Sequence, residues 1–71
     1  MGNYKTIKYE CDDGIAIVSL NRPKKLNAIN FEMILELKEL TNRISQNDTI
    51  KCLIIRGEGK AFCSGADLTS G

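Results

Sequence analysis

Apolar and polar residues alternate weakly over residues 4–11, and a short apolar run follows at residues 15–20. The first segment is rich in β-branched and aromatic residues, which is typical of an edge strand. An Asp-Asp-Gly turn signal at residues 12–14 separates the two segments. The pattern predicts a β-hairpin whose second strand ends near Pro23, because proline fixes φ and lacks a backbone donor.

The next segment has the spacing of an amphipathic helix over about residues 31–45, with apolar residues separated by charged ones. Asn30 is the expected N-cap, and Glu32 places a negative charge in the first turn. The expected apolar face comprises Phe31, Ile34, Leu37, Leu40 or Thr41, and Ile44.

A second apolar run, Ile-Lys-Cys-Leu-Ile-Ile-Arg, occupies residues 50–56 and shows little alternation. Such a run suits a strand buried on both faces, as in a parallel sheet, and Cys52 is then expected to be a small core residue. Residues 57–60 are expected to form a loop, and residues 61–68 a loop that leads into a second helix. The predicted fold class is α/β.

Composition and charge exclude several classes of function and leave the predicted fold unchanged. The chain is 42% hydrophobic and 27% charged, which is ordinary for a globular protein and argues against disorder. A net charge of +1 gives no support to a nucleic-acid partner. No unbroken apolar run exceeds four residues, so the sequence predicts no membrane span.

The three cysteines are Cys11, Cys52 and Cys63, and their wide spacing fits neither a disulfide framework nor a metal site. We therefore expect a reducing, cytoplasmic setting. The chain has no histidine, which excludes Ser-His-Asp and Cys-His chemistry within these residues. Cys63 and Ser64 are accordingly interpreted as packing or loop residues.

Two motifs carry a family resemblance. Residues 19–28, Ser-Leu-Asn-Arg-Pro-Lys-Lys-Leu-Asn-Ala, resemble the L-N-R-P-x-x-x-N-A element of the enoyl-CoA hydratase/isomerase (crotonase) family. Residues 57–68, Gly-Glu-Gly-Lys-Ala-Phe-Cys-Ser-Gly-Ala-Asp-Leu, resemble its G-x-G-x-x-F-x-x-G-x-D-[LI] element. The resemblance implies the start of a crotonase-type spiral of ββα units. Because family members are several times longer, residues 1–71 are expected to be the N-terminal portion of an incomplete domain.

The resemblance implies chemistry on acyl-CoA thioesters, in which two backbone N–H groups stabilise negative charge on the thioester oxygen. Losing one donor of this kind costs roughly 3–4 kcal/mol of barrier. By resemblance the Ala66 N–H is one donor, and Gly65 lets the backbone approach closely. A helix beginning near Asp67 would direct its N-terminal dipole at the same oxygen. Without the resemblance, Gly65 and Ala66 would be interpreted as an ordinary turn, and Asp67 as a helix cap.

The same resemblance implies that both motifs bind coenzyme A, which is part of the substrate, so that no separate cofactor is expected. Leu26, Asn27 and Ala28 are expected to lie beside the segment 64–68 and cradle the adenine. Positive side chains before them are candidates for the phosphates, although surface loop charge is the default interpretation. The implied CoA-binding residues are Arg22, Lys24, Lys25, Leu26, Asn27, Ala28, Ser64, Asp67 and Leu68.

By resemblance, the general acid and base carboxylates and the second oxyanion donor lie beyond the matched region, and Glu58 and Asp67 do not occupy the matching positions. The reaction therefore stays open among hydratase, isomerase, dehalogenase, hydrolase and decarboxylase. Hydration of enoyl-CoA is preferred as the commonest. We expect the 71-residue chain alone to be inactive, and its parent to be a homo-oligomer, a trimer or hexamer.

Two non-catalytic roles also stay open. The chain could be a small CoA-binding module, or it could dock on longer relatives through an exposed sheet edge.

Overall fold

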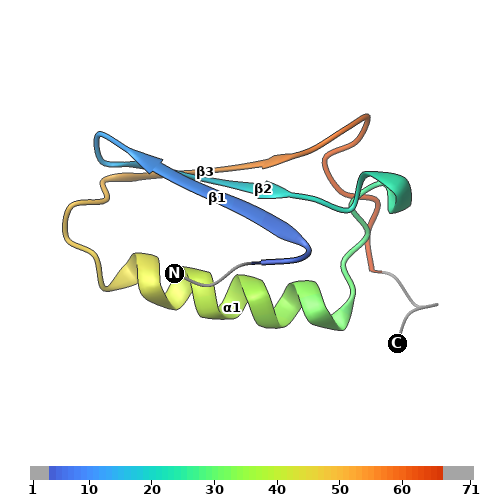
Figure 1. Cartoon of the computed structure of the whole chain (residues 1–71), viewed down its shortest axis with the longest axis horizontal. Helices are drawn as coiled ribbons and strands as arrows, with labels where there is room; N and C mark the ends of the chain where they lie inside the picture. Colours follow the sequence, from blue (N-terminus) through green and yellow to red (C-terminus); the bar gives the residue numbers. More distant parts are fainter. Residues whose placement is uncertain (1–3, 67–71) are drawn as a thin grey trace.

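The computed structural model describes residues 4–66 as a three-stranded sheet with one long helix along one face (Figure 1). The strand order is β1-β2-β3, which places β2 in the centre. This arrangement confirms the predicted α/β class. The elements are β1 (Ile7–Asp12), β2 (Ile15–Leu20), the short 3₁₀ helix η1 (Pro23–Lys25), α1 (Phe31–Ser45) and β3 (Cys52–Gly57).

The predicted hairpin is confirmed, although β1 begins three residues later than expected. Strands β1 and β2 pair antiparallel from Ile7 opposite Leu20 to Asp12 opposite Ile15. Asp13 and Gly14 join them with φ of 51° and 79°. Positive φ at both central residues is the conformation that matches the twist of a two-residue hairpin, and Asp-Gly is one of its preferred sequences.

Helix α1 has the predicted bounds and the predicted N-cap. Asn30 has extended backbone dihedrals, and its side-chain oxygen accepts a hydrogen bond from the Met33 N–H at 2.9 Å. This bond satisfies one of the donors that the first helical turn leaves without a partner.

The apolar face of α1 was predicted only in part. Leu40 is buried, and Leu37 and Ile44 pack against the core as expected. Phe31 and Ile34 are instead 66% and 49% exposed. At roughly 3.6 residues per turn, Phe31 lies on the opposite side of the helix from Leu40. The unpredicted residue on the buried face is Met33, which is 0% exposed.

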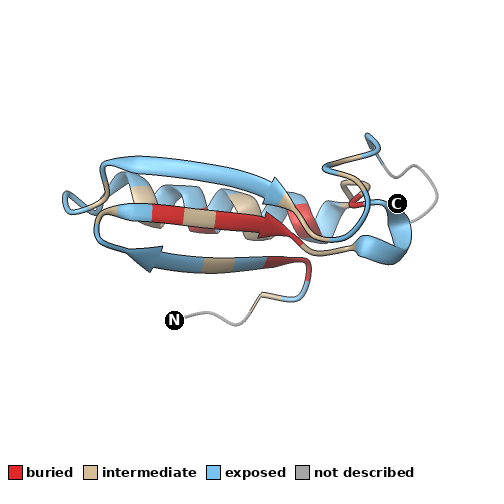
Figure 2. Ribbon diagram, turned by 90° about the horizontal axis from the view of Figure 1, so that it is seen from above, coloured by how far each residue is buried: buried red, intermediate tan, exposed pale blue. Residues whose placement is uncertain are grey.

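The core lies between α1 and the sheet, and β2 contributes most to it (Figure 2). Side chains that pair across the hairpin share one face of the sheet, so apolar residues of β1 and β2 meet the helix together. The buried cluster comprises Ile7, Val18, Leu20, Met33 and Leu40.

Strand β3 runs parallel to β2, in register from Cys52 beside Ile15 to Gly57 beside Leu20. The prediction that it is buried on both faces is wrong for this chain. Ile54 and Ile55 are 44% and 48% exposed, and Cys52 is also exposed, so it is no core residue. The reason is position: β3 is an edge strand, and within residues 4–66 it has β2 as its single neighbour.

The segment before β1 is tied to α1 through Glu36. Its carboxylate accepts hydrogen bonds from the Lys5 N–H at 2.9 Å, the Thr6 N–H at 2.8 Å and the Thr6 hydroxyl at 2.6 Å. Burial raises the pKa of Glu36, but these bonds and the Lys5 charge outweigh it, so the pKa lies below its ordinary value. The charged form of Glu36 therefore holds the start of β1 against the helix.

No helix within residues 4–66 has the length and apolar character needed to cross a bilayer.

Candidate functional site

Two loops meet at one end of the sheet. The first loop (residues 21–30) follows β2, and the second loop (residues 58–66) follows β3 (Figure 1). Because β2 and β3 are parallel, their carboxyl ends lie side by side, and the Glu58 N–H continues the pairing by donating to the Leu20 carbonyl at 2.8 Å. The carboxyl ends of parallel strands are where open α/β sheets place their ligands. The loops carry both sequence motifs.

The first loop is tightly wound on itself. The Lys25 and Asn27 N–H groups both donate to the Arg22 carbonyl, at 2.9 and 2.8 Å. Leu26 and Asn27 then take left-handed backbone conformations, with φ of 52° and 57°. Two consecutive residues of this kind are uncommon outside glycine, so the turn is held by contacts elsewhere.

Asn27 supplies those contacts. Its side chain is 0% exposed, and its oxygen accepts from the Arg22 N–H at 2.8 Å. Its Nδ2 donates to the carbonyls of Glu58 at 2.8 Å and Ala61 at 2.7 Å. Its side chain is therefore directed at the second loop. Sequence reasoning included Asn27 in the CoA loop but missed this connection.

The second loop folds back over the end of β3, and Gly57 and Gly59 permit this close approach. A Cβ on Gly57 would lie 2.5 Å from the Phe62 carbonyl oxygen. Gly59 has φ of 83°, and a Cβ there would lie 2.9 Å from Pro23 Cβ in the first loop. Real Cβ contacts of this length do not occur, so the Gly-x-Gly spacing of the motif is a packing requirement.

Gly65 and Ala66 lie against the first loop, which the family resemblance implied to lie beside the segment 64–68. The Ile29 N–H donates to the Gly65 carbonyl at 2.8 Å, and Ile29 and Ala66 form a parallel bridge. Gly65 has φ of 111°, a conformation that side chains other than hydrogen rarely adopt. Both residues are exposed. The backbone hydrogen bonds among residues 4–66 include none donated by the Ala66 N–H.

The remaining CoA candidates divide by accessibility. Lys24, Lys25 and Leu26 are exposed on η1 and the turn after it. Ser64 is exposed too, and its hydroxyl donates to the Lys25 carbonyl at 3.4 Å, so the two loops also touch there. Arg22 and Ala28 are half-buried, and the Arg22 guanidinium donates to the Ala28 carbonyl. Asp67, Leu68 and the expected second helix lie outside the described residues.

The carboxylate of Glu58 is paired with a side chain of β3. It lies 4.0 Å from the Arg56 guanidinium, which also donates to the buried Ser19 hydroxyl at 2.9 Å. The loop pair thus offers a backbone donor and positive side chains. Such an arrangement can bind an anionic ligand and stabilise charge on an oxygen.

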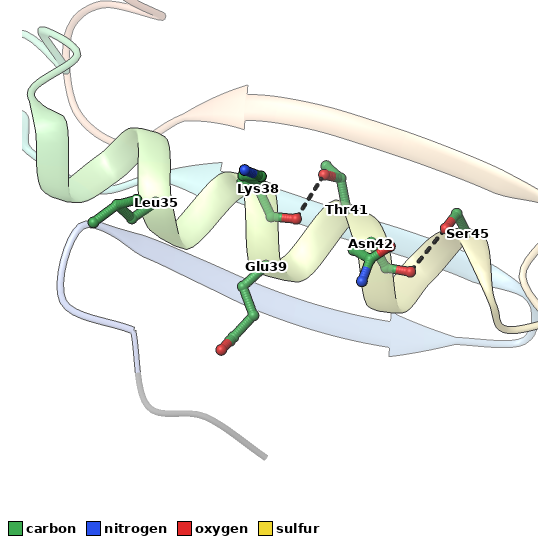
Figure 3. Close-up of a pocket in the computed structure, with 6 residues that line it drawn as sticks. All are labelled: Leu35, Lys38, Glu39, Thr41, Asn42 and Ser45. Carbon is green, nitrogen blue, oxygen red and sulfur yellow. Dashed lines mark hydrogen bonds between the residues drawn. The ribbon is translucent and has the colours of Figure 1, made fainter.

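A separate hollow lies on the outer face of α1, well away from the loops (Figure 3). Its hydroxyl groups are satisfied within the helix: Thr41 donates to the Lys38 carbonyl at 3.2 Å, and Ser45 donates to the Asn42 carbonyl at 2.8 Å. This shallow surface therefore presents no converging polar groups. It is lined by Leu35, Lys38, Glu39, Thr41, Asn42 and Ser45.

Comparisons with known proteins show which family this chain resembles. The family model described as enoyl-CoA hydratase/isomerase matches residues 15–70. The chain is 42% identical over 57 residues to the 1,2-epoxyphenylacetyl-CoA isomerase of Escherichia coli, covering 80% of this chain and 22% of that protein. It is 39% identical over 69 residues to a probable enoyl-CoA hydratase of Rhodobacter capsulatus, covering 97% of this chain and 26% of that protein.

The fold agrees with the sequence comparison. A crystal structure of an enoyl-CoA hydratase/isomerase from Mycobacterium paratuberculosis matches with a TM-score of 0.90 and 43% identity, covering 94% of this chain and 26% of that one. The chain thus spans about a quarter of the length of these relatives. Both motifs begin within the matched residues, and the loops that bear them are packed together. The family recognised from the two motifs is confirmed, and the chain belongs to the enoyl-CoA hydratase/isomerase family.

Proposed function

We propose that this chain forms one wall of an acyl-CoA site, in which the Ala66 N–H donates a hydrogen bond to the thioester carbonyl oxygen. The observation that carries the proposal is the Ile29–Gly65 contact. The Ile29 N–H donates to the Gly65 carbonyl at 2.8 Å and so fixes the peptide unit that also carries the Ala66 N–H, while Ala66 itself stays exposed.

The chemical value of this donor depends on its being held before the substrate arrives. As a thioester becomes enolate-like, negative charge gathers on its oxygen. A fixed backbone N–H then strengthens its hydrogen bond without the cost of reorienting. The bridge between Ile29 and Ala66 supports such preorganisation. By resemblance, a second donor comes from a part of the enzyme outside this chain.

Coenzyme A is proposed to run along the first loop. Lys24 and Lys25 are the preferred phosphate partners, because both are exposed and lie at the end of η1. Arg22 is less suited, since its guanidinium already donates to the Ala28 carbonyl. Leu26, 48% exposed, offers an apolar surface beside them that can contact the adenine.

Hydration of enoyl-CoA is the proposed reaction of the whole enzyme, with isomerisation as the alternative that its relatives' names support. In hydration the elements of water add across the enoyl double bond, which requires a general base and a general acid. By resemblance, the carboxylates that would play these roles lie beyond the matched region. We therefore propose that the 71-residue chain binds and polarises the thioester but does not turn it over.

The proposed cellular setting rests on the cysteines, and the proposed assembly rests on the family resemblance. Cys11, Cys52 and Cys63 are all free thiols, which supports a reducing, cytoplasmic setting. Assembly of the whole enzyme as a homotrimer or hexamer is proposed from the family resemblance.

A chimaera tests the proposed reaction. Residues 1–71 would replace the matching segment of the Rhodobacter capsulatus protein, and hydration of crotonyl-CoA would be followed by loss of its enoyl absorbance. The intact relative is the control that this assay reports hydration. We expect turnover by the chimaera and none by the 71-residue chain alone. A folded chimaera without turnover would contradict the proposal, and turnover by the short chain would contradict its inactivity.

A further inference from the structure

We propose that Asn27 is a positioning residue, whose buried amide fixes the second loop on the first and thereby orients the Ala66 N–H. The inference rests on the proposed function for its chemical meaning. Its structural content, that one side chain couples the two loops, stands on the geometry alone.

The hydrogen bonds of the Asn27 amide all join it to other groups of this chain. The Asn27 oxygen accepts from the Arg22 N–H, and its nitrogen donates to the Glu58 and Ala61 carbonyls, all within 2.7–2.8 Å. The side chain is 0% exposed. A fully buried amide whose two donors are both used cannot also reach a ligand, so its contribution to a site must pass through the loops it joins.

The contacts between the two loops lead up to the proposed donor. Asn27 holds the second loop at Glu58 and at Ala61, and two residues further along the first loop the Ile29 N–H holds it again at Gly65. The second loop is therefore anchored along its length to a single short stretch of the first. Ala66, the residue after the last anchor, inherits its orientation from these three points.

Asparagine matches this position better than aspartate or glycine. It must accept at one end and donate twice at the other, which an amide does and a carboxylate does not. An aspartate oxygen would face the Glu58 and Ala61 carbonyl oxygens. The backbone φ of 57° is also one that asparagine tolerates better than most residues. Glycine would tolerate φ but would remove all three bonds.

Two substitutions separate these contributions. Asn27→Gly keeps the backbone conformation accessible and deletes the amide, whereas Asn27→Asp keeps the shape and the acceptor but loses the donors. The measurement is amide hydrogen exchange by NMR on the ligand-free chain. It compares the Ile29 N–H, which bonds Gly65, with the Val18 N–H in the central strand of the same sample.

We expect the Ile29 amide to exchange at least about tenfold faster, relative to Val18, in both variants than in the native chain. In Asn27→Asp this excess should shrink as the pH falls, because a protonated carboxyl regains one donor. If Asn27→Gly loses its fold as a whole, the Asp variant decides on the same ratio. An unchanged ratio in a folded variant would overturn the inference.

A ligand arm keeps this result distinct from the proposed function. Crotonyl-CoA should shift the Ala66 amide resonance of the native chain more than free CoA does, and Asn27→Gly should lose that difference at concentrations of either ligand that saturate the variant. Loss of the difference supports positioning, and a difference retained in the variant overturns it. No shift in the native chain would contradict the thioester proposal, while the exchange ratio would still decide whether Asn27 couples the loops.

Discussion

The side-chain nitrogen of Asn27 donates to the Ala61 carbonyl at 2.7 Å, although the two residues are 34 positions apart in the sequence. This bond joins the loop after β2 to the loop after β3. The two family motifs are thereby one structural unit: the asparagine of the first motif closes the turn of the second.

Removing the Asn27 amide should therefore destabilise the chain as well as loosen its loops. Asn27→Ala leaves the carbonyls of the half-buried residues Glu58 and Ala61 without this donor, and an unsatisfied group removed from water costs roughly 1–3 kcal/mol. We expect a loss of that order in the free energy of unfolding, measured in urea. The matched control is Asn42→Ala on the exposed side of α1, where the change should stay within about 0.5 kcal/mol. Equal effects of the two substitutions would contradict this account.

The Glu36 carboxylate should make stability depend on pH. Its pKa is lowered in the folded chain, so its contribution is present above the ordinary value of 4.5 and is lost as the pH falls through the lowered pKa. Glu36→Gln should lower the unfolding midpoint at neutral pH. The native chain and the variant should converge under acid conditions.

The control for Glu36 is Glu32→Gln, one turn earlier on α1, which should remove no more than a helix-terminus contribution of about 0.3–1 kcal/mol. Unfolding of all three proteins would be followed by circular dichroism across the acid range. A gap between native chain and Glu36→Gln that persists unchanged at low pH would refute the proposed role of the charge.

Gly59 and Gly65 provide a graded test of loop packing. Both have left-handed φ, at 83° and 111°, so alanine is strained at either position, by about 1–2 kcal/mol. At Gly59 the new methyl would also meet Pro23 at 2.9 Å, whereas at Gly65 no described atom lies within 4 Å. Gly59→Ala should be the more destabilising in a urea titration. The reverse order would show that the two loops do not pack as described.

The exposed edge of β3 should make the isolated chain self-associate. An edge strand with unpaired backbone groups and exposed apolar side chains is a template for further pairing. Ile54 is 44% exposed, so Ile54→Lys should leave the fold intact and reduce the sedimentation coefficient at high concentration. Lys51→Arg, which keeps the charge beside the strand, is the control. Equal association of both variants would exclude this edge as the contact.

Local features were predicted well because their causes lie within a few residues. The Asp13-Gly14 turn and the Asn30 cap each depend on short-range bonds, so the hairpin and both ends of α1 follow from the pattern. Burial of β3 could not be predicted in the same way, because an apolar strand is buried only where other strands or helices pack against it. The place of Met33 on the buried face depends on the rotation of α1 against the sheet, which apolar spacing alone left ambiguous.

The candidate site, too, was predicted only in part, because some of its contacts join residues far apart in the sequence. The resemblance indicated which two loops matter, and the structure brings them together. The bonds from Asn27 to residues 31 and 34 positions away have no local signal. The spacing of Gly57 and Gly59 in the motif was the one available indication that this loop turns back sharply.

The Ala66 N–H can be deleted by a substitution that does not shorten the side chain. Ala66→Pro in the chimaera deletes the N–H, and loss of a single oxyanion donor lowers kcat by roughly 10²–10³-fold. Ala66→Ser retains the N–H and should lose little activity. Comparable activity in the Pro and Ser variants would show that this N–H is not the donor.

The chemical shift of the Ala66 amide tests most directly whether its N–H donates to the thioester oxygen. It would be followed in the 71-residue chain during titration with crotonyl-CoA and, separately, with free CoA. Both ligands carry the phosphates and adenine, and only the thioester has the carbonyl oxygen that the donor would meet. We expect both ligands to perturb the first loop around Lys24 and Lys25, and crotonyl-CoA to shift the Ala66 amide more than free CoA does. An Ala66 resonance that responds equally to both ligands, or to neither, would contradict this expectation.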